Sequence, residues 1–136
     1  MTNINELSGD HVFAVAVAGN GTAGTADEFS ALVAPFSMRI TAVKWIPAAA
    51  ITANGTNYFT LTLRNRGAAG AGSALPAQRA YSSGNAAAFV SESMTLSGTA
   101  ADLRVAAGDV LTVEKLVAAS GLAMPDGVVQ IHAQAA

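Results

Sequence analysis

Three glycines near the start of the chain have the spacing of a dinucleotide-binding turn. Gly19, Gly21 and Gly24 follow an apolar run from Val12 to Ala18. In a dinucleotide-binding domain, such a turn directs backbone N–H groups and the N-terminus of a helix at a pyrophosphate. These residues could therefore bind a nucleotide cofactor, if the surrounding elements have the order that this fold requires.

The residues after these glycines argue against a nucleotide site. Asp27 and Glu28 would place negative charge where the phosphate must bind. A ribose-binding acid is expected about 20 residues further on, but no Asp or Glu occurs between Glu28 and Glu92. A parallel sheet also needs helices between its strands, and the pattern of the chain predicts strands. The glycines are therefore interpreted as a turn.

No other group of residues predicts catalysis or metal binding. His11 and His132 lie far apart in the sequence, and Asp10 beside His11 provides only two adjacent candidate metal ligands. The nucleophile motif G-x-S-x-G does not occur. The chain has no cysteine, which excludes thiolate nucleophiles and cysteine-ligated metals. We expect no catalytic residue, no metal, no cofactor and no enzymatic activity.

Composition excludes two further classes of function. Hydrophobic residues make up 51% of the chain and charged residues 12%, with a net charge of −2, whereas charged residues usually make up about a quarter. Without a cluster of basic residues, we expect no nucleic-acid binding. The longest uncharged run is interrupted by Pro47 and a polar turn, so we expect no membrane span. The low charge indicates either many alanines in small patches or a surface covered by partners.

Along the elements that position these residues, side chains of two kinds alternate with a period of two. Phe59, Leu61 and Leu63 alternate with the side chains between them, as in a strand with one buried face. Similar runs occur at residues 11–18, 37–46, 108–117 and 127–134, and shorter ones at 28–34, 89–97 and 103–106. Turn sequences separate these runs. The pattern predicts an all-β fold, a single antiparallel β-sandwich or jelly-roll-like domain of about eight short strands, with Trp45 and Phe59 in its core.

The domain organisation follows from the same reading. Residues 1–10 are interpreted as a possible N-terminal arm and residues 11–136 as the β-sandwich domain, with a long Gly/Ala-rich loop at about 66–89. A loop of this length is either mobile or ordered by a partner. Arg64 and Arg66, at the end of an expected strand, belong either to a solvated rim or to ion pairs between subunits.

Two long stretches resemble a known family of virion proteins. The stretches FSMRITAVKWIPAAAITANGTNYFTLTLRNRG and VAAGDVLTVEKLVAASGLAMPDGVVQIHAQ are similar to tailed-bacteriophage capsid decoration proteins, also called head-stabilising or cement proteins. The resemblance implies a β-rich structural protein, commonly a homotrimer, that is made in the host bacterial cytoplasm. It further implies that the protein sits on the outer capsid surface, binds the major capsid protein and clamps adjacent capsomers. The motifs are those of hairpins and carry no catalytic residue.

Two further expectations depend on this function. The N-terminal arm is either a frayed terminus or a segment that orders on the capsid or a neighbouring subunit, and the candidate contact residues are Asn3, Ile4, Asn5, Glu6 and Leu7. The alternative function is a virion-surface adhesion or glycan-binding β-sandwich module. In that case Trp45, Tyr58 and Tyr81 are the candidates for stacking on sugars.

Overall fold

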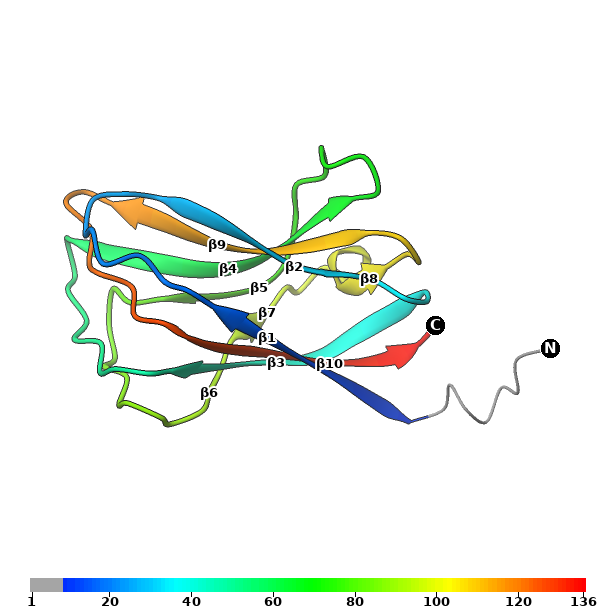
Figure 1. The fold of residues 1–136 in the computed structure, drawn as a ribbon, viewed down its shortest axis with the longest axis horizontal. Coiled ribbons are helices and arrows are strands. Elements are labelled where there is room, and N and C mark those ends of the chain that lie inside the picture. The colour runs from blue at the N-terminus through cyan, green and yellow to red at the C-terminus, as the bar shows by residue number, and fades with distance from the viewer. Residues whose placement is uncertain (1–8) are drawn as a thin grey trace.

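The computed structural model describes residues 9–136, and these fold into two antiparallel sheets stacked face to face (Figure 1). The prediction of an all-β sandwich is confirmed. No helix in the described residues is long and apolar enough to cross a membrane. The elements are β1 (Asp10–Val17), β2 (Asp27–Val33), β3 (Met38–Pro47), β4 (Tyr58–Gly67), β5 (Ala74–Ala80), β6 (Glu92–Ser93), β7 (Thr95–Leu96), the short 3-10 helix η2 (Ala100–Leu103), β8 (Arg104–Val105), β9 (Val110–Ala118) and β10 (Gly127–Ala135).

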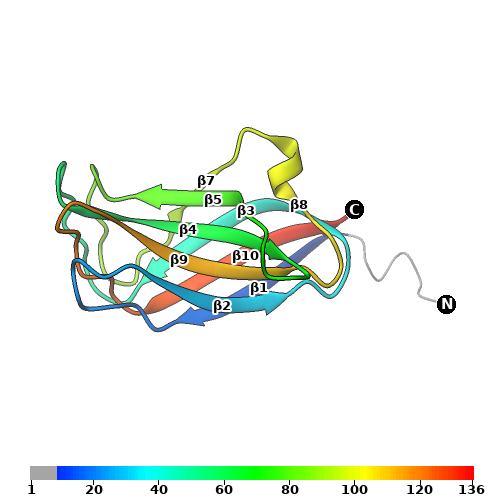
Figure 2. The ribbon, with the colours of Figure 1, turned by 90° about the horizontal axis from the view of Figure 1, so that it is seen from above.

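The two sheets share the strands evenly. One sheet has the order β1-β10-β3-β6, with β8 also pairing with β3, and the other has the order β2-β9-β4-β5-β7. Figure 2 shows β1 and β2 along one side of the sandwich, with β5 and β7 along the opposite side. The structure has seven strands of at least seven residues and three of two residues, where about eight were predicted.

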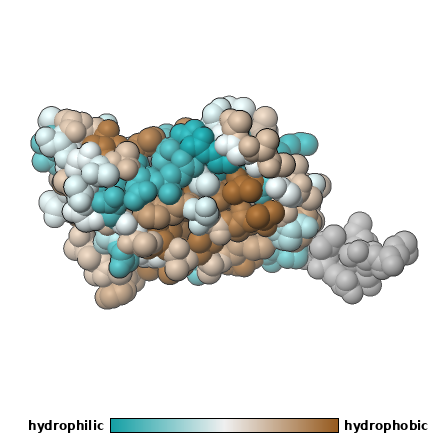
Figure 3. Space-filling view, turned by 45° about the horizontal axis from the view of Figure 1, so that its top comes forward, coloured by the Kyte–Doolittle hydropathy of each residue, from teal (hydrophilic) through white to brown (hydrophobic). Residues whose placement is uncertain are grey.

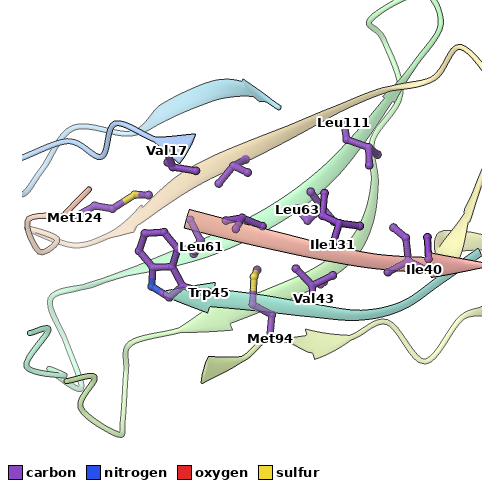
Figure 4. Packing of buried hydrophobic residues seen from close by; sticks show 14 of the residues in the cluster. Val17, Ile40, Val43, Trp45, Leu61, Leu63, Met94, Leu111, Met124 and Ile131 are labelled. Atoms are coloured by element: carbon purple, nitrogen blue, oxygen red, sulfur yellow. The ribbon is translucent and has the colours of Figure 1, made fainter. Parts of the chain in front are cut away.

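The core lies between the sheets and is formed by the alternating apolar residues. Phe59, Leu61 and Leu63 of β4 are fully buried, as the period of two predicts. Trp45 is also fully buried, so the prediction that Trp45 and Phe59 belong to the core is confirmed. Side chains from both sheets meet in this layer (Figure 4), among them Val17, Val43, Leu111, Met124 and Ile131.

The predicted long loop at about 66–89 is wrong, because it contains strand β5. β5 pairs with β4, and Ala77 of β5 lies buried opposite Leu63. The sequence of β5, ALPAQRA, has no β-branched residue and little intrinsic preference for a strand. Its pairing with β4 and the burial of Ala77 stabilise the strand, and neither is visible in the local sequence. What remains of the loop is a turn at 68–73 and the segment after β5.

Candidate functional site

The segment between β5 and β6 carries Phe89, the most exposed large hydrophobic side chain of the described residues. Ala87, Ala88, Phe89 and Val90 are four successive exposed residues, which we call the apolar tip. Phe89 is 76% exposed and Val90 is 52% exposed. Phe89 also has a φ of +60°, a left-handed conformation that is unfavourable for a bulky side chain. The apolar tip is therefore both exposed to solvent and conformationally strained.

Backbone hydrogen bonds hold the apolar tip against neighbouring loops. Ala86, directly before the tip, exchanges two hydrogen bonds of 2.9 Å with Ile51. The Phe89 N–H donates to the carbonyl oxygen of Pro47 at 2.8 Å. These bonds fix the backbone on the N-terminal side of the Phe89 Cα atom. On its other side, the Val90 N–H donates to the carbonyl oxygen of Ala87 at 3.4 Å, and together these bonds support the strained φ. The backbone that carries Phe89 is therefore anchored to the end of β3 and the loop after it.

A buried polar network fixes the base of the same segment. The hydroxyl group of Tyr81 donates to Glu92 Oε1 at 2.5 Å, and Arg79 Nη2 lies 3.2 Å from Glu92 Oε2. The Arg79 guanidinium stacks 4.1 Å from the centre of the Tyr81 ring and also donates to the carbonyl oxygens of Ser83 and Gly84. Burial, and then the hydrogen bond to Glu92, raises the pKa of Tyr81 above its usual range. The network thus links the end of β5 and the turn at Ser83 and Gly84 to Glu92, where β6 begins.

A band of charged side chains crosses the outer face of the sheet that contains β2, β9 and β4. The charged band consists of Glu28, Arg64, Arg66 and Glu114. Arg64 pairs with Glu114 at 2.7 Å, and Arg66 pairs with both Glu28 and Glu114. Figure 3 shows a continuous hydrophilic strip on this face, flanked by hydrophobic surface. The charges therefore satisfy one another within the chain.

The charged band corrects one interpretation of the two arginines. Arg64 and Arg66 do not form a solvated rim, because their side chains are only 15% and 28% exposed and both make ion pairs. Hydrogen bonds from Arg66, opposed in part by burial and supplemented by the Thr112 hydroxyl, lower the pKa of Glu28 to about 2. Ion pairs of these arginines with another subunit remain a prediction.

The glycine-rich turn is confirmed as a turn, and it binds a cation of the chain itself. Strand β2 follows the turn. The Lys115 ammonium, which is fully buried, donates to the carbonyl oxygens of Thr22 at 2.8 Å, Ala23 at 3.3 Å and Asn20 at 3.4 Å. Burial lowers the pKa of Lys115. The turn presents carbonyl oxygens to an ammonium group, the opposite of the N–H groups that a phosphate requires.

The remaining candidate residues do not come together in one site. His132 lies opposite Val12 and His11 opposite Ala133, so the two histidines are on neighbouring strands but on alternate faces. The His11 ring packs edge-on against Phe36 at 4.9 Å. Within residues 9–136 no group of three or more potential ligands could hold a metal ion. The arm residues Asn3, Ile4, Asn5, Glu6 and Leu7 lie outside the described residues.

The candidates for stacking on sugars are largely inaccessible. Trp45 and Tyr81 are fully buried, and Tyr58 is half-buried. The prediction that Trp45 and Tyr81 could stack on a glycan is therefore wrong, because both rings are part of the core. Among the described residues, Phe89 is the exposed aromatic side chain. The pattern at 89–97 predicts that Phe89 lies in a short strand, but β6 begins only at Glu92.

Comparison with known proteins provides a structural likeness but shows no family. No protein-family model matches the chain, and curated proteins gave no significant match. The fold is similar to a chain in the structure of infectious bursal disease virus, Gx strain, with a TM-score of 0.44 and 12% sequence identity. The match covers 92% of this chain and 32% of the viral chain, so this chain spans about a third of the length of the other. At this identity no residue role passes from one chain to the other.

Proposed function

We propose that this protein is a structural virion protein of a bacteriophage and has no enzymatic activity. It decorates the outer capsid surface as a homotrimer, binds the major capsid protein and stabilises the shell by clamping adjacent capsomers. The resemblance of residues 36–67 and 105–134 to decoration proteins and the confirmed β-sandwich support this proposal. The observation that carries it is the apolar tip, an exposed aromatic side chain on a segment held by backbone hydrogen bonds.

The apolar tip has the properties of an anchor for a protein partner. Phe89 and Val90 lose water when they enter a pocket on the capsid, which stabilises the complex by about 1.5–3 kcal/mol for each fully buried side chain. Because hydrogen bonds already fix the segment, little further conformational entropy is lost on binding. Many copies on one lattice then strengthen attachment through a high effective concentration.

Reconstitution on capsids tests this function. Particles of the virus that encodes the protein, prepared without it, are mixed with wild-type protein, with a Phe89→Ala/Val90→Ala variant, or with a Val33→Ala control. Val33 is a suitable control because its side chain is 61% exposed but lies at the end of β2, away from the apolar tip. Occupancy is measured by co-sedimentation and capsid survival by heating.

We expect wild-type protein and the Val33→Ala control to bind and to raise the temperature at which capsids break. The double variant should fold normally and lose at least about tenfold in affinity, since two buried anchors are truncated. Equal survival of capsids with and without the wild-type protein would overturn the proposed function. Normal occupancy of the double variant would show that the apolar tip is not the anchor.

A further inference from the structure

Strand β1 is the outermost strand of its sheet. Its eight residues pair with β10 from Asp10–Gln134 to Val17–Gly127, and no other described strand pairs with β1. The outer edge of such a strand presents backbone N–H and C=O groups that can extend the sheet into another chain.

The other sheet edges are protected against such pairing. β2 carries Asp27 and Glu28, and its register with β9 shifts between Ser30 and Leu32. The edge strand β7 has two residues, as do β6 and β8, which lie beside β3. Charges, bulges and very short strands are the devices that keep edges from associating.

β1 has none of these devices along most of its length. Between Val12 and Val17 the strand contains no charged residue and no proline. Its register with β10 is continuous, whereas each of the other four long pairings contains a shift. Val12 is 51% exposed, and Ala14 and Ala16 are exposed beside it. The strand therefore presents a long, regular and apolar edge.

We propose that this edge of β1 pairs antiparallel with the same edge of a second copy of the chain. The same edge on a second copy is a complementary partner of equal length, and a two-fold axis makes the two edges equivalent. A pairing centred on Ala14 places Val12 opposite Ala16 of the partner subunit, so small apolar side chains meet on the outer face. The six residues from Val12 to Val17 provide an edge of about 20 Å.

This pairing does not depend on the proposed function. It follows from the edge of β1 alone and involves none of the residues of the apolar tip. On a capsid, the two-fold contact would join subunits of neighbouring trimers. In solution, it would produce species with an even number of copies.

Charge substitution at the centre of the edge tests the pairing. An Ala14→Lys variant places two lysines opposite each other across the two-fold axis, where like charges repel. Ser30→Lys is the matched control, because it adds the same charge to an exposed position on the other long edge strand, β2. Native mass spectrometry over a range of concentrations measures self-association, and circular dichroism checks the fold of each variant.

We expect wild-type protein and Ser30→Lys to form even-numbered species, and Ala14→Lys to weaken them by about tenfold. Mixing Ala14→Lys with Ala14→Glu should restore association as a mixed species, because opposite charges then face each other. Hydrogen exchange of amides in residues 10–17 should slow as concentration rises. The mixture keeps the test decisive even if one variant is less stable.

Three results would overturn the pairing. One is wild-type protein that stays monomeric or forms only trimers at every concentration. Another is equal association of Ala14→Lys and Ser30→Lys. The third is protection of residues 10–17 in a monomer that disappears when residues 1–8 are deleted, which would show that the chain's own N-terminal residues cover the edge. Capsid binding by the wild type would be unaffected by any of these results, so the two proposals fail separately.

Discussion

The ammonium group of Lys115 lies 2.8 Å from the carbonyl oxygen of Thr22, inside the turn whose glycines have the dinucleotide spacing. Strand β9 places Lys115 on the face that points into the sandwich, together with Leu111 and Val113. The turn folds over the end of this side chain and supplies the oxygen atoms that water would otherwise supply. Its glycines thus belong to a structural corner whose carbonyl oxygens solvate a buried cation.

Replacing Lys115 by Met should destabilise the protein by about 2 kcal/mol. Met has a similar volume but no donor. The carbonyl oxygens of Asn20 and Thr22 keep the N–H groups of Met124 and Thr25, whereas that of Ala23 loses its donor, at a cost of about 1–3 kcal/mol for a buried group. Removing a buried charge offsets part of this loss. Urea unfolding measures the change, with Lys44→Met as the control, because Lys44 bonds to Ser93 in an exposed position. A variant at least as stable as wild type would contradict a stabilising role of the ammonium group.

Acid should weaken the fold through Glu28. Its pKa is about 2 in the folded protein, below the value of about 4.3 in an unfolded chain. Ionised Glu28 therefore stabilises the fold above about pH 4.5, and this contribution is lost as the pH falls towards about 2. Glu28→Gln should lower the free energy of unfolding by about 1–2 kcal/mol at neutral pH, allowing for solvent screening of a partly exposed pair.

The measurement for Glu28 is urea unfolding of both proteins between neutral pH and about pH 2. The difference between wild type and Glu28→Gln should shrink as the pH falls. Asp10→Asn is the control, since Asp10 bonds to Gln134 in an exposed position. A difference that stays constant with pH would contradict the role of the Glu28 charge.

Gly121 should tolerate no side chain. Its φ is +68°, and a Cβ atom there would lie 2.0 Å from the carbonyl oxygen of Ala23, in the turn around Lys115. Gly121→Ala should destabilise the protein by about 3 kcal/mol or more, since backbone must move. Gly108 has a φ of +89° and open space around it, so Gly108→Ala should cost only about 1–2 kcal/mol. Thermal unfolding distinguishes the two; equal losses would mean that conformation alone, without the contact, sets the cost.

Phe89→Gly should separate stability from binding. Glycine adopts a positive φ without strain, so the variant should be as stable as wild type or more stable by about 0.5–1 kcal/mol. Capsid attachment should nevertheless fall, because the anchor is removed. Thermal unfolding and co-sedimentation of the same preparation provide the two readouts. A clear loss of stability would show that the Phe89 ring supports the fold.

Much of the fold could be predicted because large apolar residues alternate in the long strands. Phe59, Leu61 and Leu63 identify β4, and the same alternation could have indicated that Lys115 points inward with Leu111 and Val113. The turn at Gly19 could also be predicted, since the residues after it are incompatible with a phosphate site. In these places local sequence and tertiary packing favour the same structure.

The rest depends on contacts between distant residues. β5 forms because β4 pairs with it and buries Ala77, which no property of ALPAQRA indicates. Phe89 looks like a strand residue, but its N–H donates to the carbonyl oxygen of Pro47, and Ala86 before it bonds to Ile51, both far away in sequence. Arg64 and Arg66 find their partners on β9 and β2. Such partners are known only once the sheets are assembled.

The pairing of β1 with β10 has a consequence for synthesis on the ribosome. β10 is the sole described neighbour of β1 in its sheet and follows it by about 110 residues, which take about 5–20 s to translate. During that interval β1 lacks the strand with which it pairs in the folded protein. The last described strand to be synthesised is thus the one that completes the sheet of the first.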